Sequence, residues 1–383
     1  MEYLSEEALI SLRKTLHQQP DLSGQEGATA ALVKKELQKT DPDQLLTGVG
    51  GQGMVAIYNG KEPQRGCRVM LRCELDGLPI TEETGLDYAS AKDGTMHACG
   101  HDGHMAILLG VARYLKENRP EKGVVLLVFQ PAEETGEGAG WMLNDPAFQE
   151  LEIDRAFALH NLPGYEENTV HLRNGTFACA SVGVDVQFKG SSSHAAHPEQ
   201  GLNPSRIMAE TILELQKSFD RLTEKESFER GAITFVQLGE RAFGMNPGSG
   251  AMGMTIRAET DEELESIYID VESHLHRAAE RFDGEVSFSK AEPFAATINE
   301  DEGVEVVEQA AKALSIDCHY KEVPFGWSED VGMFREKCPV TLFGLGSGKD
   351  HPPLHAATYD FNDRLLATGT KLFIEIIKHY NHG

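Results

Sequence analysis

The sequence of 383 residues has no run of about 18 apolar residues, which is the length that a membrane-spanning helix requires. It is also short of positive charge, with 35 lysines and arginines against 61 aspartates and glutamates, so the formal net charge is −26. Such a charge repels nucleic acids and anionic membrane surfaces at long range. We therefore expect neither a membrane nor a nucleic acid among its partners.

Cysteine is sparse and irregularly spaced, with six residues in a chain too long to depend on disulfide bonds for its stability. The first residues, "MEYLSEEALISLRK", are acidic and amphipathic, whereas a secretory signal has a basic segment before an apolar one. Both features predict reduced thiols and a cytoplasmic location. "NGT" at Asn174 matches a glycosylation acceptor, but between "TVHLR" and "TFACA" it is more simply explained as a hairpin turn.

Motifs of several large enzyme classes are missing as well. "GVGGQG" at residues 48–53 fits the dinucleotide-binding pattern, but a strand follows it where that fold needs a helix. "GLGSGKD" has the wrong glycine spacing for a phosphate-binding loop and carries Asp350 in place of Ser or Thr. No G-x-S-x-G nucleophile turn occurs. These absences argue against a dehydrogenase, a kinase and a serine hydrolase.

What the sequence does contain is an alternation of helical and strand patterns over residues 1–178, for example the helix "HMAILLGVARYLKEN" followed by the strand "GVVLLVFQ". Strands separated by helices predict an α/β sheet that is covered on both faces. Residues 179–292 instead have the order strand, helix, strand, strand, helix, strand, which is typical of a small four-stranded sheet with two helices. Residues 293–383 return to the first pattern. We therefore predict an α/β domain, 1–178 and 293–383, interrupted by an inserted α+β domain, 179–292.

Residues that bind metals well gather near the ends of the predicted strands. "GTMHACGHDGHMAILLG" places Cys99 and His101 two residues apart in a glycine-flanked loop, where both can face one cation. Ligands of open α/β sheets bind at the carboxyl ends of the strands, and thiolate, imidazole and carboxylate together suit divalent metals. Each such residue alone is more often structural, but the set predicts a metal site. Its further candidates are Glu74 and Asp76, Glu133 and Glu134, His160, His351 and His355.

These residues stand in a series of motifs, which are, in order, "LRCELDGLPITEETGLDYAS", "GTMHACGHDGHMAILLG", "FQPAEETGEGA", "FALHNLPG", "KGSSSHAAHPEQGLNP", "WSEDVGMF" and "HPPLHAATYDF". The series resembles the amidohydrolase branch of the M20 metallopeptidases, which includes hippurate hydrolases, N-acyl-amino-acid deacylases and auxin-conjugate hydrolases. The resemblance implies a dinuclear-metal α/β catalytic domain with a mixed sheet flanked by helices, interrupted by a four-stranded, two-helix lid domain that mediates dimer contacts.

The resemblance also implies a role for each site residue, around two divalent metal ions that we expect to be Zn²⁺ or Mn²⁺, with Co²⁺ and Ni²⁺ as alternatives. Asp76 would orient a ligand, and Glu133 would be the general base. His194 would reach a neighbouring subunit to hold the reacting carbonyl. Asn246 and Arg257 would bind the substrate carboxylate. The implied metal ligands are Cys99, His101, Glu134, His160 and His355.

Some positions depart from the family pattern or stay unassigned. Glu74 stands where aspartate is usual, and "FGMNPGSGAMG" around Asn246 lacks the usual apolar continuation. His97 and His104 are not expected to be direct ligands. His197 and His351 are expected to be supportive at most.

The predicted reaction is hydrolysis of the amide bond of an N-acyl-amino acid by a metal-activated water. A dipeptidase or carboxypeptidase for small peptides would use the same residues. Cys99 with His97 or His101 could instead serve a thiol hydrolase. A non-catalytic binding protein would lack a ligand or the base, and none is missing. The expected partners are thus the small substrate and further copies of the chain, as a homodimer or higher homo-oligomer.

Overall fold

The computed structural model describes residues 5–381, which divide into two compact units. Within this part of the chain, unit 1 takes in residues 5–177, 297–322 and 329–381, and unit 2 takes in the remainder. Unit 2 includes the short segment Val323–Ser328 as well as Ala178–Ala296. Among the described residues, no helix combines the length and the apolar character needed to cross a membrane.

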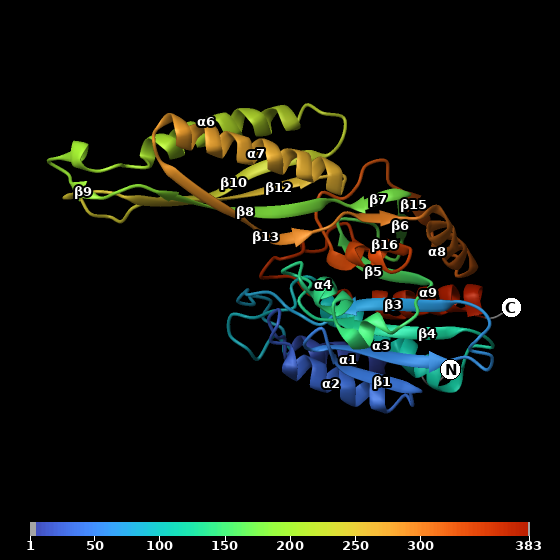
Figure 1. Ribbon diagram of the computed structural model, residues 1–383. Coiled ribbons are helices and arrows are strands. Elements are labelled where there is room, and N and C mark those ends of the chain that lie inside the picture. Colours follow the sequence, from blue (N-terminus) through green and yellow to red (C-terminus); the bar gives the residue numbers. More distant parts are fainter. Residues whose placement is uncertain (1–4, 382–383) are drawn as a thin grey trace. The chain divides into compact units, whose positions relative to one another are not determined.

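Unit 1 is built on a mixed eight-stranded sheet with the order β1-β2-β4-β3-β5-β16-β6-β15 (Figure 1). β3 runs parallel to β4 and β5, and β16 runs parallel to β5, whereas β1, β2 and β4 pair antiparallel. The central strands are buried on both faces, which explains their nearly continuous apolar sequences. The strands are β1 Gln44–Val49, β2 Gly53–Asn59, β3 Arg68–Glu74, β4 Val124–Gln130, β5 Arg155–Pro163, β6 Val170–Leu172, β15 Cys318–Tyr320 and β16 Val340–Gly348.

Five long helices form one core with the sheet, in which Phe129 and Phe157 of the strands meet Ile107 and Phe373 of the helices. Side chains alternate along a strand, so the intervening residues face the other side, where Arg72 contacts Asp330 of a 3₁₀ helix. The sheet is therefore covered on both faces. The helices of the first face are α1 Glu6–His17, α2 Gly27–Gln38, α3 His101–Glu117, α8 Asp301–Ala313 and α9 Leu365–Asn381. The shorter ones are α4 Gly138–Leu143, α5 Pro146–Gln149 and η3 Asp330–Glu336.

Unit 2 is an antiparallel sheet with the order β10-β12-β8-β13, and α6 and α7 lie side by side on one of its faces (Figure 1). The order of its strands and helices along the chain is the one predicted from sequence. Its elements are β8 Ala180–Lys189, η2 Pro198–Gln200, α6 Ser205–Leu222, β10 Glu229–Leu238, β12 Ser249–Ala258, α7 Asp261–Arg281 and β13 Glu285–Phe294, with the short pair β9 Ser193–His194 and β11 Met245–Asn246. The mixed sheet with flanking helices and the smaller α+β unit confirm the predicted fold class.

The hairpin predicted at "NGT" is wrong. β6, which precedes Asn174, pairs with β15 and β16 of the large sheet, whereas β7, Gly175–Ala178, pairs with β14, Thr297–Asn299. Gly175 has a φ of 71° and turns the chain from one sheet to the other. Alternation of apolar residues identifies a strand but not its partner, so two neighbouring strands resembled a hairpin.

Candidate metal centre

The predicted site residues of unit 1 converge where β3, β4 and β5 bring their carboxyl halves together. Asp76 follows β3, and Glu133 and Glu134 follow β4. His160 lies inside β5, three residues before its end, and not at the end of the strand as predicted, because β5 continues to Pro163 alongside β16. Cys99 and His355 come from the loops before α3 and α9.

Two groups of potential ligands share the sulfur of Cys99. One group is Cys99, His101 and His160, and the other is Cys99, Glu134 and His355. Within each group, one ligand atom per residue lies within 4.8 Å of the others. A thiolate that belongs to both groups is placed where it can contact two cations.

Gly100 makes this arrangement sterically feasible. Its φ is 98°, and a Cβ atom at this position would lie 2.5 Å from Asn161 Oδ1 and 2.8 Å from the Tyr359 hydroxyl. Only glycine fits both the left-handed backbone and the close packing. The turn at Gly100 starts α3 and brings Cys99 and His101 into the same ligand group.

Backbone carbonyls fix the orientation of two imidazoles. His101 Nδ1 lies 2.9 Å from the Asp76 carbonyl oxygen, and His160 Nδ1 lies 2.9 Å from the Asn161 carbonyl oxygen. A ring that donates through Nδ1 leaves the lone pair of Nε2 available to a metal ion. His101 Nε2 is buried and has no hydrogen-bond partner, and the same holds for Glu134 Oε1. These atoms fit a site for a cation.

The charges of the side chains in and around the ligand groups also favour a cation. Burial alone would lower the pKa of His101, but Asp76, Glu74 and Glu134 raise it to about 10. Burial and neighbouring carboxylates raise the pKa of Glu134 to about 7, although His101 opposes this. Burial, Glu329 and Glu134 raise the pKa of Glu133 well above its usual value. Negative charge is therefore in excess here, and a bound divalent cation would relieve it.

His104 is part of a further ligand-spaced group, with Glu74 and His101, but its ring nitrogens make hydrogen bonds of their own. Its Nδ1 lies 2.7 Å from Glu74 Oε2, and its Nε2 lies 2.7 Å from Asn161 Oδ1. Both ring nitrogens are thus engaged. Glu74 uses its other oxygen for an ion pair with Arg72.

Glu133 stands beside the ligand groups without belonging to either group that contains Cys99. One of its oxygens lies 3.7 Å from His101 Nε2. The carboxylates of Glu329 and Asp330 are also close to the carboxylate of Glu133. Arg72 donates to both of these carboxylates, at 2.9 Å and 2.7 Å. Sequence reasoning missed this role of Arg72; an arginine inside an apolar strand was the available signal, as was "WSED" for its partners.

A second supporting group comes from the segment between α1 and α2. Ser23 donates to Asp76 Oδ2 at 2.7 Å, and the backbone N–H of Glu134 donates to the same oxygen at 3.0 Å. Glu26 is fully buried and accepts the N–H of Ala132 at 2.8 Å. Ala132 has a φ of 48°, so this bond holds the strained turn that immediately precedes Glu133. Sequence patterns gave no indication of Ser23 or Glu26.

His194, Asn246 and Arg257 all lie in unit 2. β9 and β11 pair so that His194 stands opposite Met245, and Asn246 Nδ2 donates to Ser193 Oγ at 3.1 Å. His194 is exposed, with Nδ1 accepting the N–H of Ala196.

Arg257 is apart from this pair, on β12. It donates to the Gly326 carbonyl oxygen at 3.1 Å and to Ser328 Oγ at 3.2 Å. The segment that carries these acceptors is therefore attached to unit 2 through Arg257. The substrate-binding roles of His194, Asn246 and Arg257 stay predictions.

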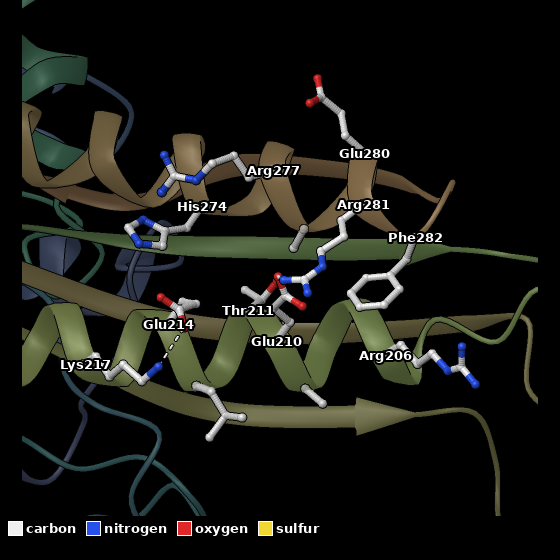
Figure 2. Close-up of a pocket in the computed structure, with 13 residues that line it drawn as sticks. Arg206, Glu210, Thr211, Glu214, Lys217, His274, Arg277, Glu280, Arg281 and Phe282 are labelled. Atoms are coloured by element: carbon white, nitrogen blue, oxygen red, sulfur yellow. Dashed lines mark hydrogen bonds and ion pairs between the residues drawn. The ribbon is translucent and has the colours of Figure 1, made fainter.

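An open groove of about 1180 Å³ runs between α6 and α7 (Figure 2). It contains none of the predicted site residues, and its charged side chains largely pair with one another. Glu210 accepts from Arg281 at 2.8 Å, and Lys217 donates to Glu214 at 2.7 Å. The groove is therefore a weaker candidate for the active site than the ligand groups at the strand ends.

Comparisons with known proteins identify the family of this chain. The family described as Peptidase family M20/M25/M40 matches residues 70–379. A hippurate hydrolase of Campylobacter jejuni is 30% identical, over 96% of this chain and 95% of its own. An N-acetyl-L-cysteine deacetylase of Bacillus subtilis is 32% identical, over 92% of this chain and 83% of its own.

Among solved structures, the YXEP protein of Bacillus subtilis, described as a dinuclear metal binding peptidase of the M20 family, has a TM-score of 0.80 at 25% identity. The match covers 97% of each chain. Both units of the fold are thus shared with a solved relative along nearly their whole length.

Proposed function

Because the chain belongs to peptidase family M20/M25/M40, we propose that it is a metal-dependent amidohydrolase that cleaves the amide bond of an N-acyl-amino acid. The observation that carries this proposal is the pair of ligand groups that share Cys99 at the carboxyl ends of parallel strands. Relatives named for hippurate and N-acetyl-L-cysteine support the substrate class, since both compounds are N-acyl-amino acids.

We assign Cys99, His101, Glu134, His160 and His355 as the residues that would hold two divalent cations. When bound, such cations polarise the scissile carbonyl and lower the pKa of the attacking water toward neutrality. Thiolate and imidazole favour Zn²⁺, and the carboxylate suits Mn²⁺. All six cysteines are free thiols, which supports a reducing compartment such as the cytoplasm.

The protein side chains would then move the proton. Glu133 takes a proton from the attacking water and delivers it to the departing amine nitrogen, so that the amide bond breaks and a carboxylate and a free amino acid are released. Glu133 Oε2 lies 3.7 Å from His101 Nε2, so this carboxylate is beside the proposed ligands. Asp76 keeps His101 in the ligating tautomer, and we assign His194, Asn246 and Arg257 to the carbonyl and carboxylate of the substrate.

A thiol hydrolase is the main rival from another class, because Cys99 Sγ lies 3.5 Å from His160 Nε2. Burial and the carboxylates of Glu134 and Glu133 raise the pKa of the Cys99 thiol well above its usual value. A nucleophilic cysteine needs the opposite shift. The carboxylate-rich surroundings thus favour Cys99 as a ligand, whose proton is displaced by a cation.

The proposal is tested by removing the metal. We expect 1,10-phenanthroline to abolish hydrolysis of N-benzoyl- and N-acetyl-amino acids, and excess Mn²⁺ or Zn²⁺ to restore it. Activity that resists the chelator and is lost on alkylation with iodoacetamide would contradict the proposal and establish the thiol hydrolase. The readout is release of the free amino acid.

Substrate preference distinguishes the proposed N-acyl-amino-acid hydrolase from a dipeptidase on the same fold. We expect kcat/KM for N-acyl-amino acids to exceed that for dipeptides of the same carboxyl-terminal residue, with each assayed at saturating metal. The opposite ranking would make the chain a peptidase. Varying the acyl group from acetyl to benzoyl to long-chain acyl would then define the acyl pocket.

We further propose that two copies of the chain associate through unit 2. β10 lies at an edge of its sheet and exposes Phe235, Val236 and Leu238. Phe243, which follows β10, is 94% exposed. An edge strand with exposed apolar side chains is a surface that pairing with a second copy would cover.

A further inference from the structure

Arg13 of α1 is fully buried although it is charged, and it takes no part in the proposed chemistry. Its Nε donates to Asp363 at 2.8 Å, and its Nη1 donates to Asp360 at 2.6 Å and lies 3.6 Å from Asp102. Three carboxylates and the hydroxyl of Tyr88, at 3.4 Å, thus surround one guanidinium. Burying a charge in this way costs folding free energy unless its partners are held in place.

His17 extends the same contact one helical turn further along α1. Its Nδ1 lies 2.8 Å from Asp102 Oδ2, and its Nε2 lies 3.4 Å from Glu82. Both His17 and Asp102 are completely buried. α1 therefore presents two cationic side chains, Arg13 and His17, to a single aspartate.

The carboxylates that Arg13 contacts lie in or next to the two loops that carry proposed metal ligands, one before α3 and one before α9, and Asp102 itself is in the first turn of α3. Asp102 directly follows His101, and Asp360 is five residues beyond His355. These loops also touch each other, because the N–H of His355 donates to the Ala98 carbonyl oxygen at 2.9 Å. His355 has a φ of 63°, a conformation that surrounding contacts must maintain.

We propose that Arg13 is a positioning residue of the metal centre, which clamps the Cys99–His101 loop to the His355 loop through Asp102, Asp360 and Asp363. The proposal rests on the ligand set of the proposed function. A guanidinium is suited to this task because its donors diverge in a fixed plane and can hold several carboxylates at once. Without the clamp, His355 is free to leave the ligand group that it shares with Cys99 and Glu134.

The clamp predicts that changing Arg13 weakens metal binding more than it weakens the fold. Arg13→Met should raise the Kd of the metal-free enzyme for Mn²⁺ about tenfold or more, which is the scale on which groups behind metal ligands act. Arg13→Lys keeps the charge but loses the divergent donors, so its Kd should fall between those of Arg13→Met and the wild type. Isothermal titration calorimetry of each metal-free protein measures these constants.

Arg155→Met is the matched control, because Arg155 lies in the same unit and forms ion pairs with Glu302 and Glu300 away from the ligand loops. It should lower Tm without changing the Kd for Mn²⁺. Substitution with Co²⁺ gives a second readout, since the absorption of a Co²⁺–thiolate centre reports its coordination. This spectrum should change in Arg13→Met and stay as in the wild type in Arg155→Met.

Folded Arg13→Met with the Kd and Co²⁺ spectrum of the wild type would overturn the clamp. If Arg13→Met does not fold, Asp363→Asn removes one partner at a less buried position, and it should raise the Kd severalfold; an unchanged Kd there overturns the clamp equally. A wild type that binds no Mn²⁺, Zn²⁺ or Co²⁺ would contradict the proposed function itself, so the two failures are distinguishable.

Discussion

The orientation of a few side chains distinguishes these ligand groups from an ordinary buried polar cluster. His101 and His160 each have Nδ1 beside a backbone carbonyl oxygen, which leaves Nε2 for a ligand. Glu133 and Glu134 are neighbours in sequence, yet only Glu134 belongs to the group with Cys99 and His355. Glu133 forms a separate group with His101 and Glu134, and we propose that it serves the reacting water while Glu134 serves a cation.

The variant Glu133→Gln tests this division of roles. An amide cannot accept the proton of the attacking water, so kcat should fall by about 10²–10⁴. Metal content should stay at the wild-type level, because Glu134 and the other ligands are untouched. Steady-state kinetics and elemental analysis of the purified protein check both expectations.

Glu137→Gln is the control, since Glu137 lies in the same turn but is exposed. It should keep the wild-type kcat. Full turnover by Glu133→Gln would mean that the base lies elsewhere, and loss of metal in that variant would make Glu133 a ligand.

At the scale of elements, the strands were the predictable part of the structure. Apolar runs located β3, β4 and β5, and the polar residues that follow them indicated a site at the sheet edge. The family indicated by the motifs is confirmed by the comparisons. What the sequence could not reveal were contacts between distant segments, such as Arg72 with Glu329 or Glu26 with Ala132. No periodicity encodes these pairs.

Helix α1 illustrates this limit and carries a prediction of its own. Burial would lower the pKa of His17, but Asp102 and Glu82 raise it to about 10. A raised pKa means that the protonated form stabilises the fold: the contribution is complete below the unfolded pKa of about 6.5 and is lost as pH rises through about 10. The difference in unfolding free energy between the wild type and His17→Gln should therefore be largest near pH 6 and shrink toward pH 10.

Urea unfolding followed by circular dichroism at pH 6, 8 and 10 measures this difference. His379→Gln, at an exposed position of α9, is the control and should match the wild type throughout. A His17→Gln difference that is independent of pH would show that packing, and not charge, gives His17 its effect.

At the scale of the whole molecule, unit 2 is inserted at a position that leaves the large sheet of unit 1 intact. The chain leaves unit 1 after β7 and returns at β14, and these two strands pair with each other. Exit and entry therefore lie side by side, so unit 2 can be inserted without disturbing the sheet that carries the site. Residues beyond the insertion then complete that sheet, because β16 lies between β5 and β6.

Association through β10 is the prediction at this scale. Sedimentation equilibrium of the wild type should give a multiple of the 42.1 kDa chain mass. Val236→Glu places a charge among the exposed apolar residues of β10 and should shift the mass toward that of the single chain. Activity should fall in parallel, because His194 is expected to serve a neighbouring subunit.

Leu213→Glu, at an exposed position of α6, is the matched control and should leave the mass unchanged. A wild type that sediments as a single chain, or a Val236→Glu variant that associates normally, would contradict association through β10.

The clamp at Arg13 has a consequence for how the protein is made. Asp360 and Asp363 lie 347 and 350 residues after Arg13 in the chain. At the usual rate of synthesis, roughly 20–70 s therefore pass between the synthesis of Arg13 and that of Asp360 and Asp363. His355 is synthesised at nearly the same time as these two partners. The full set of proposed metal ligands therefore exists only after His355 has been made, and we expect a polypeptide that is shortened before this residue to bind the metals incompletely.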